Sequence, residues 1–366
     1  MPSIWQGIAW ALRQGKSGGV SRWRLAWRAF DACLRHRRAM NRWMAVAFEM
    51  QARGLADDLP GEYLRAVRPC VHRRTSPSER VVQLTDHFDW LETAFKPAAF
   101  ERLTSGRPLV LAELPAPRGY AYMRLQLTRT PPSSPEGELL LTLTLQRAAD
   151  VQKSRPVDAA ALAFSRFRID DSGCLAIGGV RGQRHPVLRI SSNELASALS
   201  GWKPPVLMVR VAQELARHWG LVLVGLNPGW HPLQGWTYQL SPRNREAAQR
   251  LYASYDALWE HFDASKGPPG WMVLPLNSDE QLAATDLSPE KRQRQTQRAD
   301  YWIRIRNLLR LQLRELLQKP GREAQVSRIT QAMPLEVGAP DDAAYFASDE
   351  DVVPSRVLAT GPGTLT

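Results

Sequence analysis

The spacing of hydrophobic residues changes from a helical period to a period of two after the first third of the chain. Apolar side chains occupy every second position in 121–127 and again in 139–145, which predicts two half-buried strands. A short apolar run at 109–112 predicts a strand before them. Residues 162–169 predict a fourth strand, with a slip of phase at Ser165 and Arg166 that is typical of a β-bulge. Because short turns join these strands, an antiparallel meander is the simplest topology.

The stretch from Leu175 to Asn227 has the pattern strand, loop, helix, strand. A short apolar run opens it, and a polar loop leads to the helix entrance Gly201-Trp202-Lys203-Pro204-Pro205. The helical pattern continues to Trp219 and ends at Gly220, and residues 221–226 are apolar throughout, as in a fully buried strand. In units of this kind ligands commonly bind where the loop meets the helix.

Helical patterns occur before and after these strands. Prolines interrupt the helical pattern of the segment that precedes the first strand. A helix is predicted from about Arg243 to Phe262, and a further strand from Trp271 to Leu276. A long final helix is predicted to begin at Ser288, an N-cap residue that is followed by Pro289 at the first helical position.

Together these elements predict an α+β protein with N-terminal helices, a central mixed and mainly antiparallel sheet, and a long basic C-terminal helix. The last segment has no hydrophobic periodicity and is expected to be disordered. In chain order the predicted regions are the basic Trp- and Arg-rich helices 1–50, the helical region 51–106, the α+β core 107–280, the basic amphipathic helix 281–320 and the acidic tail 321–366.

The net charge of +12 is distributed unevenly along the chain. Between Met1 and Ala47 there are nine Arg or Lys residues and one acidic residue, Asp31, whereas acidic residues dominate beyond Pro334. The final helix adds nine basic residues between Lys291 and Lys319. This asymmetry indicates an anionic partner for the basic segments, either a membrane surface or a nucleic acid.

An amphipathic helix near the N-terminus, with Ser21 as its N-cap, combines tryptophan with arginine. Trp23, Trp27, Phe30 and Leu34 fall on one helical face, with arginines on a neighbouring face. Indole rings and arginines suit a bilayer interface, but packing of the stripe on the core, with the arginines in solvent, is the more common behaviour of such a helix.

Residues 1–45 and 291–319 are the segments expected to contact anionic membrane lipid. No sequence pattern of a known nucleic-acid-binding module accompanies them, which makes nucleic acid the weaker alternative. Cys33, Cys70 and Cys174 are widely spaced and form no CxxC pair, which favours a reducing compartment. Because the sequence also has no long apolar run and no convincing signal peptide, a cytoplasmic location is expected, with peripheral contact to the inner membrane.

Several residues are candidates for chemistry. His231 follows the predicted buried strand, where an imidazole can serve as a general base or simply hydrogen-bond the loop backbone. Tyr255 lies on the apolar stripe of its helix, which suits a core position or a site at its edge. The seven histidines are scattered, and no zinc-ligand spacing is present, so no metal site is predicted.

The loop and the helix entrance before Pro204 carry positive charge that would attract an anion. Arg181 and Arg184 lie in this loop, and Gly201 and Lys203 stand at the helix entrance. The helix dipole and the free N–H groups of the first turn favour a phosphate or pyrophosphate at this point. The alternative is a basic loop that solvent surrounds.

Five motifs follow one another along the chain, namely Gly178–Gly182, Ser200–Met208, Val224–Asn227 with His231, Tyr255–Glu260 and Lys291–Arg298. In these motifs and their order the sequence resembles the VirK family of Gram-negative bacteria. That resemblance implies a link to virulence, envelope surface expression and tolerance of antimicrobial peptides, for a protein that lies inside the cell.

The order of the predicted elements is also similar to that of the GNAT acyltransferase fold, in which the N-terminus of a central helix holds the pyrophosphate of coenzyme A. This likeness implies an acyl-CoA or an acyl carrier protein bound before Pro205, with His231 and Tyr255 near the acceptor. The glycine signature of that fold is missing before Pro204. Two hypotheses therefore stay open, an acyltransferase-like enzyme and a non-catalytic peripheral protein that binds anionic lipid.

Overall fold

The fold is that of a computed structural model of the chain, and it confirms the α+β class. The described residues all belong to the first of two units of the chain, Met1–Ala332. The predicted N-cap Ser21, the loop residue Arg184 and the acidic tail lie outside the described residues. The described ranges are 4–13, 22–68, 70–116, 120–147, 156–169, 171–183, 190–235, 245–246, 255–276 and 288–318.

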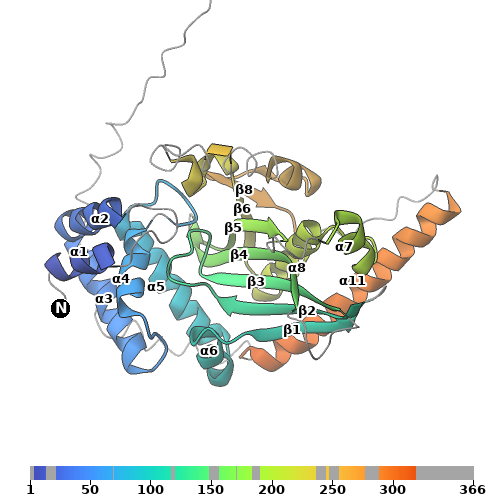
Figure 1. Cartoon of the computed structure of the whole chain (residues 1–366), viewed down its shortest axis with the longest axis horizontal. Coiled ribbons are helices and arrows are strands. Elements are labelled where there is room, and N and C mark those ends of the chain that lie inside the picture. Colours follow the sequence, from blue (N-terminus) through green and yellow to red (C-terminus); the bar gives the residue numbers. More distant parts are fainter. Residues whose placement is uncertain are drawn as a thin grey trace, which may run out of the picture. The chain divides into compact units, whose positions relative to one another are not determined.

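In the described part of the chain, six helices precede the sheet, and Figure 1 shows the first five beside one another. Trp43 lies fully buried among them, where its indole donates a hydrogen bond of 2.7 Å to the carbonyl of Glu62 and stacks on Phe88. A capping box between Ser76 and Glu79 fixes the start of the fifth helix. The helices are α1 (Ile4–Arg13), α2 (Arg22–Arg35), α3 (Arg37–Ala52), α4 (Leu59–Val67), α5 (Pro77–Ala94) and α6 (Pro97–Thr104).

The tryptophan stripe of α2 faces outward. Trp23 and Trp27 are each 66% exposed, while the opposite side of the helix buries small residues such as Ala29 and Ala32. The interpretation that this stripe packs on the core is therefore wrong. Alanines on the buried side let α2 approach its neighbours closely, which leaves the larger indoles on the surface.

The sheet has eight strands in the order β1-β2-β3-β4-β5-β6-β8-β7. The first five form the predicted antiparallel meander, β6 runs parallel to β5, and β8 lies antiparallel between β6 and the two-residue strand β7, which was not predicted. The strands are β1 (Leu109–Pro115), β2 (Tyr120–Arg129), β3 (Leu139–Arg147), β4 (Val157–Ile169), β5 (Ser172–Gly182), β6 (Val222–Leu226), β7 (Ser265–Lys266) and β8 (Trp271–Leu274).

The irregularity between β4 and β5 lies close to its predicted position. Ala163 pairs with Gly179 and Phe164 pairs with Ile177, so Gly178 is an extra residue on β5. On β4 the register therefore shifts between Ala163 and Phe164, two residues before the predicted slip at Ser165 and Arg166. The extra residue lies on β5, whereas the prediction placed the bulge on β4. A bulge bends its strand and alters the direction of the side chains beside it.

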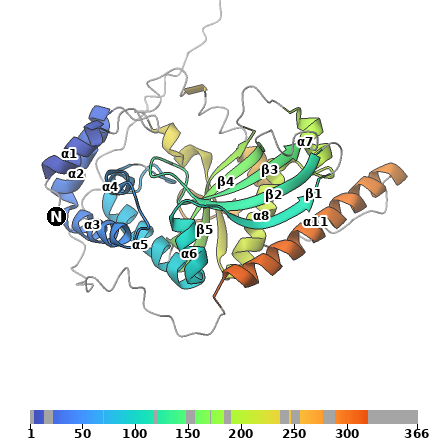
Figure 2. The same cartoon turned by 60° about the horizontal axis from the view of Figure 1, so that its bottom comes forward.

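Two helices cross from β5 to β6, and a third follows the sheet. They are α7 (Ser192–Ala198), α8 (Pro204–Trp219) and α11 (Pro289–Leu316). Gly220 ends α8 in the left-handed conformation, with φ of 64°, and Ser288 caps α11 by accepting the N–H of Lys291, both as predicted. The helix α11 packs along β1 and touches α8, and Figure 2 shows its course beside β1.

A buried cluster of charged residues joins α4 and α5 to the sheet. The Arg65 guanidinium contacts both Glu62 and Glu138, Arg80 contacts Glu138, and Arg129 lies 2.7 Å from Glu62. Each of these side chains is at most 7% exposed. Although burial acts to raise it, Arg65 and Arg80 lower the pKa of Glu138 to about 2. The cluster fixes how these helices dock because any other arrangement would leave a charge buried and unpaired.

Candidate active site where two parallel strands part

β5 and β6 pair only over a short stretch. Cys174–Ile177 align with Val222–Gly225, after which β5 continues to Gly182 without β6 beside it. The bulge at Gly178 stands directly after the last paired residue of β5. Parting strands expose backbone groups of the sheet to another ligand, and bulges are frequent next to active sites.

The helical segment 255–261 lies against both strands at the point where they part. The Tyr255 hydroxyl accepts the N–H of Val180 on β5 at 2.8 Å. The Trp259 indole donates to the carbonyl of Leu226 at 3.0 Å and packs so closely that a Cβ on Gly225 would lie 2.7 Å from its ring. These contacts fix the segment on both strands and hold the Tyr255 hydroxyl on Val180 of β5.

Tyr255 keeps its proton at neutral pH. Burial, followed by the negative charge of Glu136, raises its pKa above the ordinary value. Because the phenolic oxygen already accepts the N–H of Val180, its own O–H can be donated to a group in the site. The sequence pattern allowed Tyr255 to be a core residue. The residue is buried, with 1% of its surface exposed.

Glu136 is a site residue that the sequence did not single out. A Cβ on Gly179 would lie 2.4 Å from its carboxylate, and a Cβ on Gly178 would lie 2.3 Å from its backbone oxygen. Arg181 forms an ion pair with it at 2.7 Å. Two consecutive glycines inside a strand pattern are the signal of such a close approach. Arg181, predicted to hold a cofactor phosphate, pairs with this carboxylate.

His231 is fully buried and lies beside Tyr255. Its Nδ1 accepts the N–H of Leu233 at 3.1 Å, which assigns the proton to Nε2. Within the described residues, Nε2 is buried and has no hydrogen-bond partner. Burial lowers the pKa of His231 to about 4, and its ring meets that of Tyr255 edge-on at 6.4 Å. This geometry favours a neutral hydrogen-bond donor over the predicted general base.

Stacked rings hold the loop that carries His231. The His72 ring stacks on Trp230 with centroids 4.8 Å apart and on Trp271 at 6.0 Å. The Arg74 guanidinium lies 4.4 Å from the centre of the Trp230 ring. The backbone of this loop is thereby fixed next to the C-terminal end of β6.

The entrance of α8 lies at the same end of the sheet, because α8 is the crossover from the end of β5 back to the start of β6. Gly201 has φ of 92°, and Lys203 is the N-cap residue without a side-chain cap. Pro204 and Pro205 lack an N–H, so Val206 alone among the first three helical residues offers a backbone donor. Within the helix, the predicted set of free N–H groups is therefore reduced to that of Val206, and Lys203 precedes it as the N-cap residue.

The helix α11 partly covers this entrance. Trp202 is buried, and its indole donates to the carbonyl of Arg298 at 3.0 Å. The Arg298 guanidinium stacks over the same ring at 4.0 Å. The structure thus brings Tyr255, His231 and the α8 entrance to one end of the sheet.

The described residues contain no group of three His, Cys, Asp or Glu side chains placed to hold a metal ion. Their three cysteines are free. The side chains that form the candidate site are a carboxylate, a phenol, an imidazole and a lysine.

A family model matches residues 19–309, which is most of the chain and includes every element from α2 to the larger part of α11. The chain belongs to the DUF535 family. DUF535 is described as a protein of unknown function and is the family also known as VirK, in line with the resemblance of the motifs. No curated protein and no solved structure matches this DUF535 chain. Among its described helices, none is both long and apolar enough to cross a membrane.

Proposed function

We propose that this DUF535 protein transfers an acyl group from a coenzyme A or carrier-protein thioester to an acceptor where β5 and β6 part. The observation that carries the proposal is the Tyr255 hydroxyl, fixed on Val180 beside Glu136 and the neutral His231. The order of elements supports it too. Antiparallel strands, a central helix, a buried parallel strand, a helical segment and a final antiparallel strand pair follow one another, and we take this order as a likeness to the GNAT fold.

Acyl transfer needs three kinds of group, and this site offers each of them. A base removes the proton of the attacking acceptor, an acid protonates the leaving thiolate, and a donor stabilises the oxyanion of the tetrahedral intermediate. We assign these roles to the Glu136 carboxylate, the Tyr255 O–H and the Nε2–H of His231. Lys203 and the N-terminus of α8 would bind the anionic part of the thioester.

A thermal-shift titration with coenzyme A thioesters tests the proposal. A thioester at a hundred times its Kd would stabilise the full chain by about 2.7 kcal/mol. Because a hydrogen bond to a charged group contributes about 1.5–3 kcal/mol, Lys203→Glu is expected to weaken binding roughly ten- to a hundredfold. Lys96 is the matched control, since it too is an exposed N-cap residue before a proline, at the start of α6.

Lys96→Glu should leave the thermal shift as it is in the wild type. If no thioester and no acyl carrier protein shifts the unfolding temperature, the proposal fails. It also fails if the Lys203→Glu and Lys96→Glu variants bind the thioester equally well.

A second function is favoured by the outward tryptophans of α1 and α2. Trp5 is 76% exposed, and Trp23 and Trp27 are 66% exposed. The Arg22 guanidinium lies 5.8 Å from the centre of the Trp23 ring. Exposed indoles combined with arginines suit the headgroup region of an anionic membrane, so peripheral lipid binding is the alternative to catalysis.

Sedimentation with anionic vesicles tests the lipid hypothesis. Since fully burying a large apolar side chain is worth about 1.5–3 kcal/mol, the double change Trp23→Ala and Trp27→Ala should weaken vesicle binding about a hundredfold or more. Binding should also weaken with added salt. The control is Val82→Ala on α5, a position that is 62% exposed. Wild-type protein that stays in the supernatant at low salt would refute the hypothesis.

A further inference from the structure

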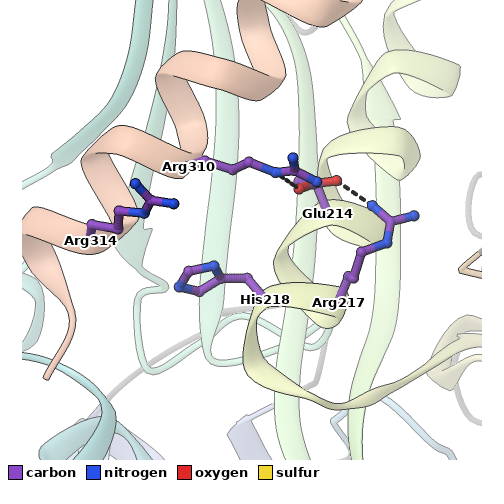
Figure 3. Close-up of a pocket in the computed structure, with 5 residues that line it drawn as sticks. All are labelled: Glu214, Arg217, His218, Arg310 and Arg314. Carbon is purple, nitrogen blue, oxygen red and sulfur yellow. Dashed lines mark hydrogen bonds and ion pairs between the residues drawn. The ribbon is translucent and has the colours of Figure 1, made fainter. Parts of the chain in front are cut away.

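A pocket with an unusual concentration of positive charge lies between α8 and α11, away from the candidate active site. Its volume is about 240 Å³, and five side chains line it (Figure 3). Three arginines and a histidine surround a single carboxylate. These residues are Glu214, Arg217 and His218 of α8 and Arg310 and Arg314 of α11.

Glu214 holds one wall of the pocket in place. Its side chain is only 2% exposed, and its carboxylate accepts from Arg310 Nε at 2.5 Å and from Arg217. Arg217 also donates to the carbonyl of Leu276. Both guanidiniums are thereby fixed while remaining about two-fifths exposed, at 43% for Arg310 and 38% for Arg217. A guanidinium held in this way presents its remaining N–H groups without further ordering.

The other wall carries positive charge without a matching carboxylate. In Figure 3, Arg314 reaches from α11 toward the imidazole of His218, one helical turn beyond Glu214. No ion pair of Arg314 occurs within the described part of the chain. Burial lowers the pKa of His218, and Arg314 and Arg310 lower it further, while Glu214 acts to raise it. The imidazole is thus neutral beside the two arginines and the carboxylate of Glu214.

The charge balance selects the chemical class of the ligand. With His218 neutral, three guanidiniums and one carboxylate leave a net charge of +2 in the pocket. A phosphate monoester carries about −1.5 to −2 at pH 7 and offers three acceptor oxygens. Arginine forks match such oxygens with pairs of hydrogen bonds. A carboxylate, with its single charge, would neutralise only half of this surplus.

We infer that the pocket between α8 and α11 binds a phosphate monoester group. The ligand that carries this group is either a phospholipid with a terminal phosphate or a small soluble phosphate ester. The pocket is distinct from the candidate active site, because His218 lies 15 residues after Lys203 on α8, a rise of roughly 22 Å at 1.5 Å per residue. The inference therefore stands or falls independently of acyl transfer.

Binding of simple phosphates to the full chain tests the inference. Glycerol 3-phosphate and inorganic phosphate serve as soluble probes in calorimetry, and vesicles containing phosphatidic acid serve as the lipid probe. Arg314→Gln is expected to weaken binding of whichever probe binds about tenfold or more, by loss of a charge-assisted contact. Arg304→Gln is the control, since Arg304 is an exposed arginine on the same helix that does not line the pocket.

The NMR titration of the His218 imidazole is a second test of phosphate binding. A change in protein stability alone would not produce the expected shift of its midpoint. A bound phosphate adds negative charge beside the ring, so its NMR titration midpoint should rise when the probe is present. Binding of soluble esters identifies a small-molecule source, and binding of phosphatidic acid vesicles alone identifies a lipid source. The inference is overturned if no phosphate probe changes the titration midpoint of His218. It is also overturned if the Arg314→Gln and Arg304→Gln variants bind the probe with equal affinity.

Discussion

Glu138→Ala is expected to lower the free energy of unfolding by about 3–5 kcal/mol, the usual cost of removing one partner from a buried ion pair. The change leaves the guanidiniums of Arg65 and Arg80 without the carboxylate that both contact. Urea denaturation of the full chain measures the loss. Glu113→Ala is the control, because Glu113 pairs with Arg124 at the surface and should contribute less than about 1 kcal/mol. Equal losses in the two variants would contradict a structural role for the cluster.

The Glu138 carboxylate also makes the free energy of unfolding depend on pH. Its pKa falls from an ordinary value of 4.5 to about 2 in the folded protein, so the unfolded chain binds its proton first as pH drops. The contribution of Glu138 is therefore fully present above about pH 4.5 and is lost as pH falls toward 2. Glu138→Gln, which cannot titrate, should show a shallower loss of stability across that interval than the wild type.

Tyr255→Phe is expected to lower the rate of acyl transfer about 10²–10⁴-fold, the usual range for loss of a general acid. Thioester affinity should change little, because Lys203 and the α8 entrance are untouched. The cost in stability should be about 1–3 kcal/mol, since the N–H of Val180 loses its acceptor.

Tyr301→Phe on α11 controls for the loss of a buried hydroxyl away from the site. Tyr301 is 7% exposed, and within the described residues its hydroxyl makes no hydrogen bond. Its variant should transfer the acyl group at the wild-type rate. A Tyr255→Phe enzyme that is as fast as Tyr301→Phe would remove the assignment of Tyr255 as the acid.

Local patterns in the sequence predicted much of the fold. Alternation placed β2 and β3, because a strand with one buried face repeats every two residues. Gly220 and Ser288 marked a helix end and a helix start through their own backbone and hydroxyl chemistry. The direction in which the α2 stripe faces was not determined, since an amphipathic face fits either a core or a membrane.

The candidate site was only partly predictable. Tyr255 and His231 do lie near each other, but the role of His231 depends on a hydrogen bond from Leu233 that no spacing reveals. Glu136 was missed because its contact with Arg181 joins segments far apart in the sequence. The phosphate pocket was missed for the same reason. The sequence did contain one indication of the pocket, because Arg310 and Arg314 are four residues apart and lie on one helical face.

Hydrogen exchange of the full chain with and without a saturating coenzyme A thioester tests the central claim most directly. If the thioester binds where β5 and β6 part, exchange should slow in the peptides that cover residues 178–182 and 203–207. Exchange in the rest of α8 and in α11 should change little. Unchanged exchange in both peptides, or slowing confined to residues 214–218 and 310–314, would contradict acyl transfer at this site.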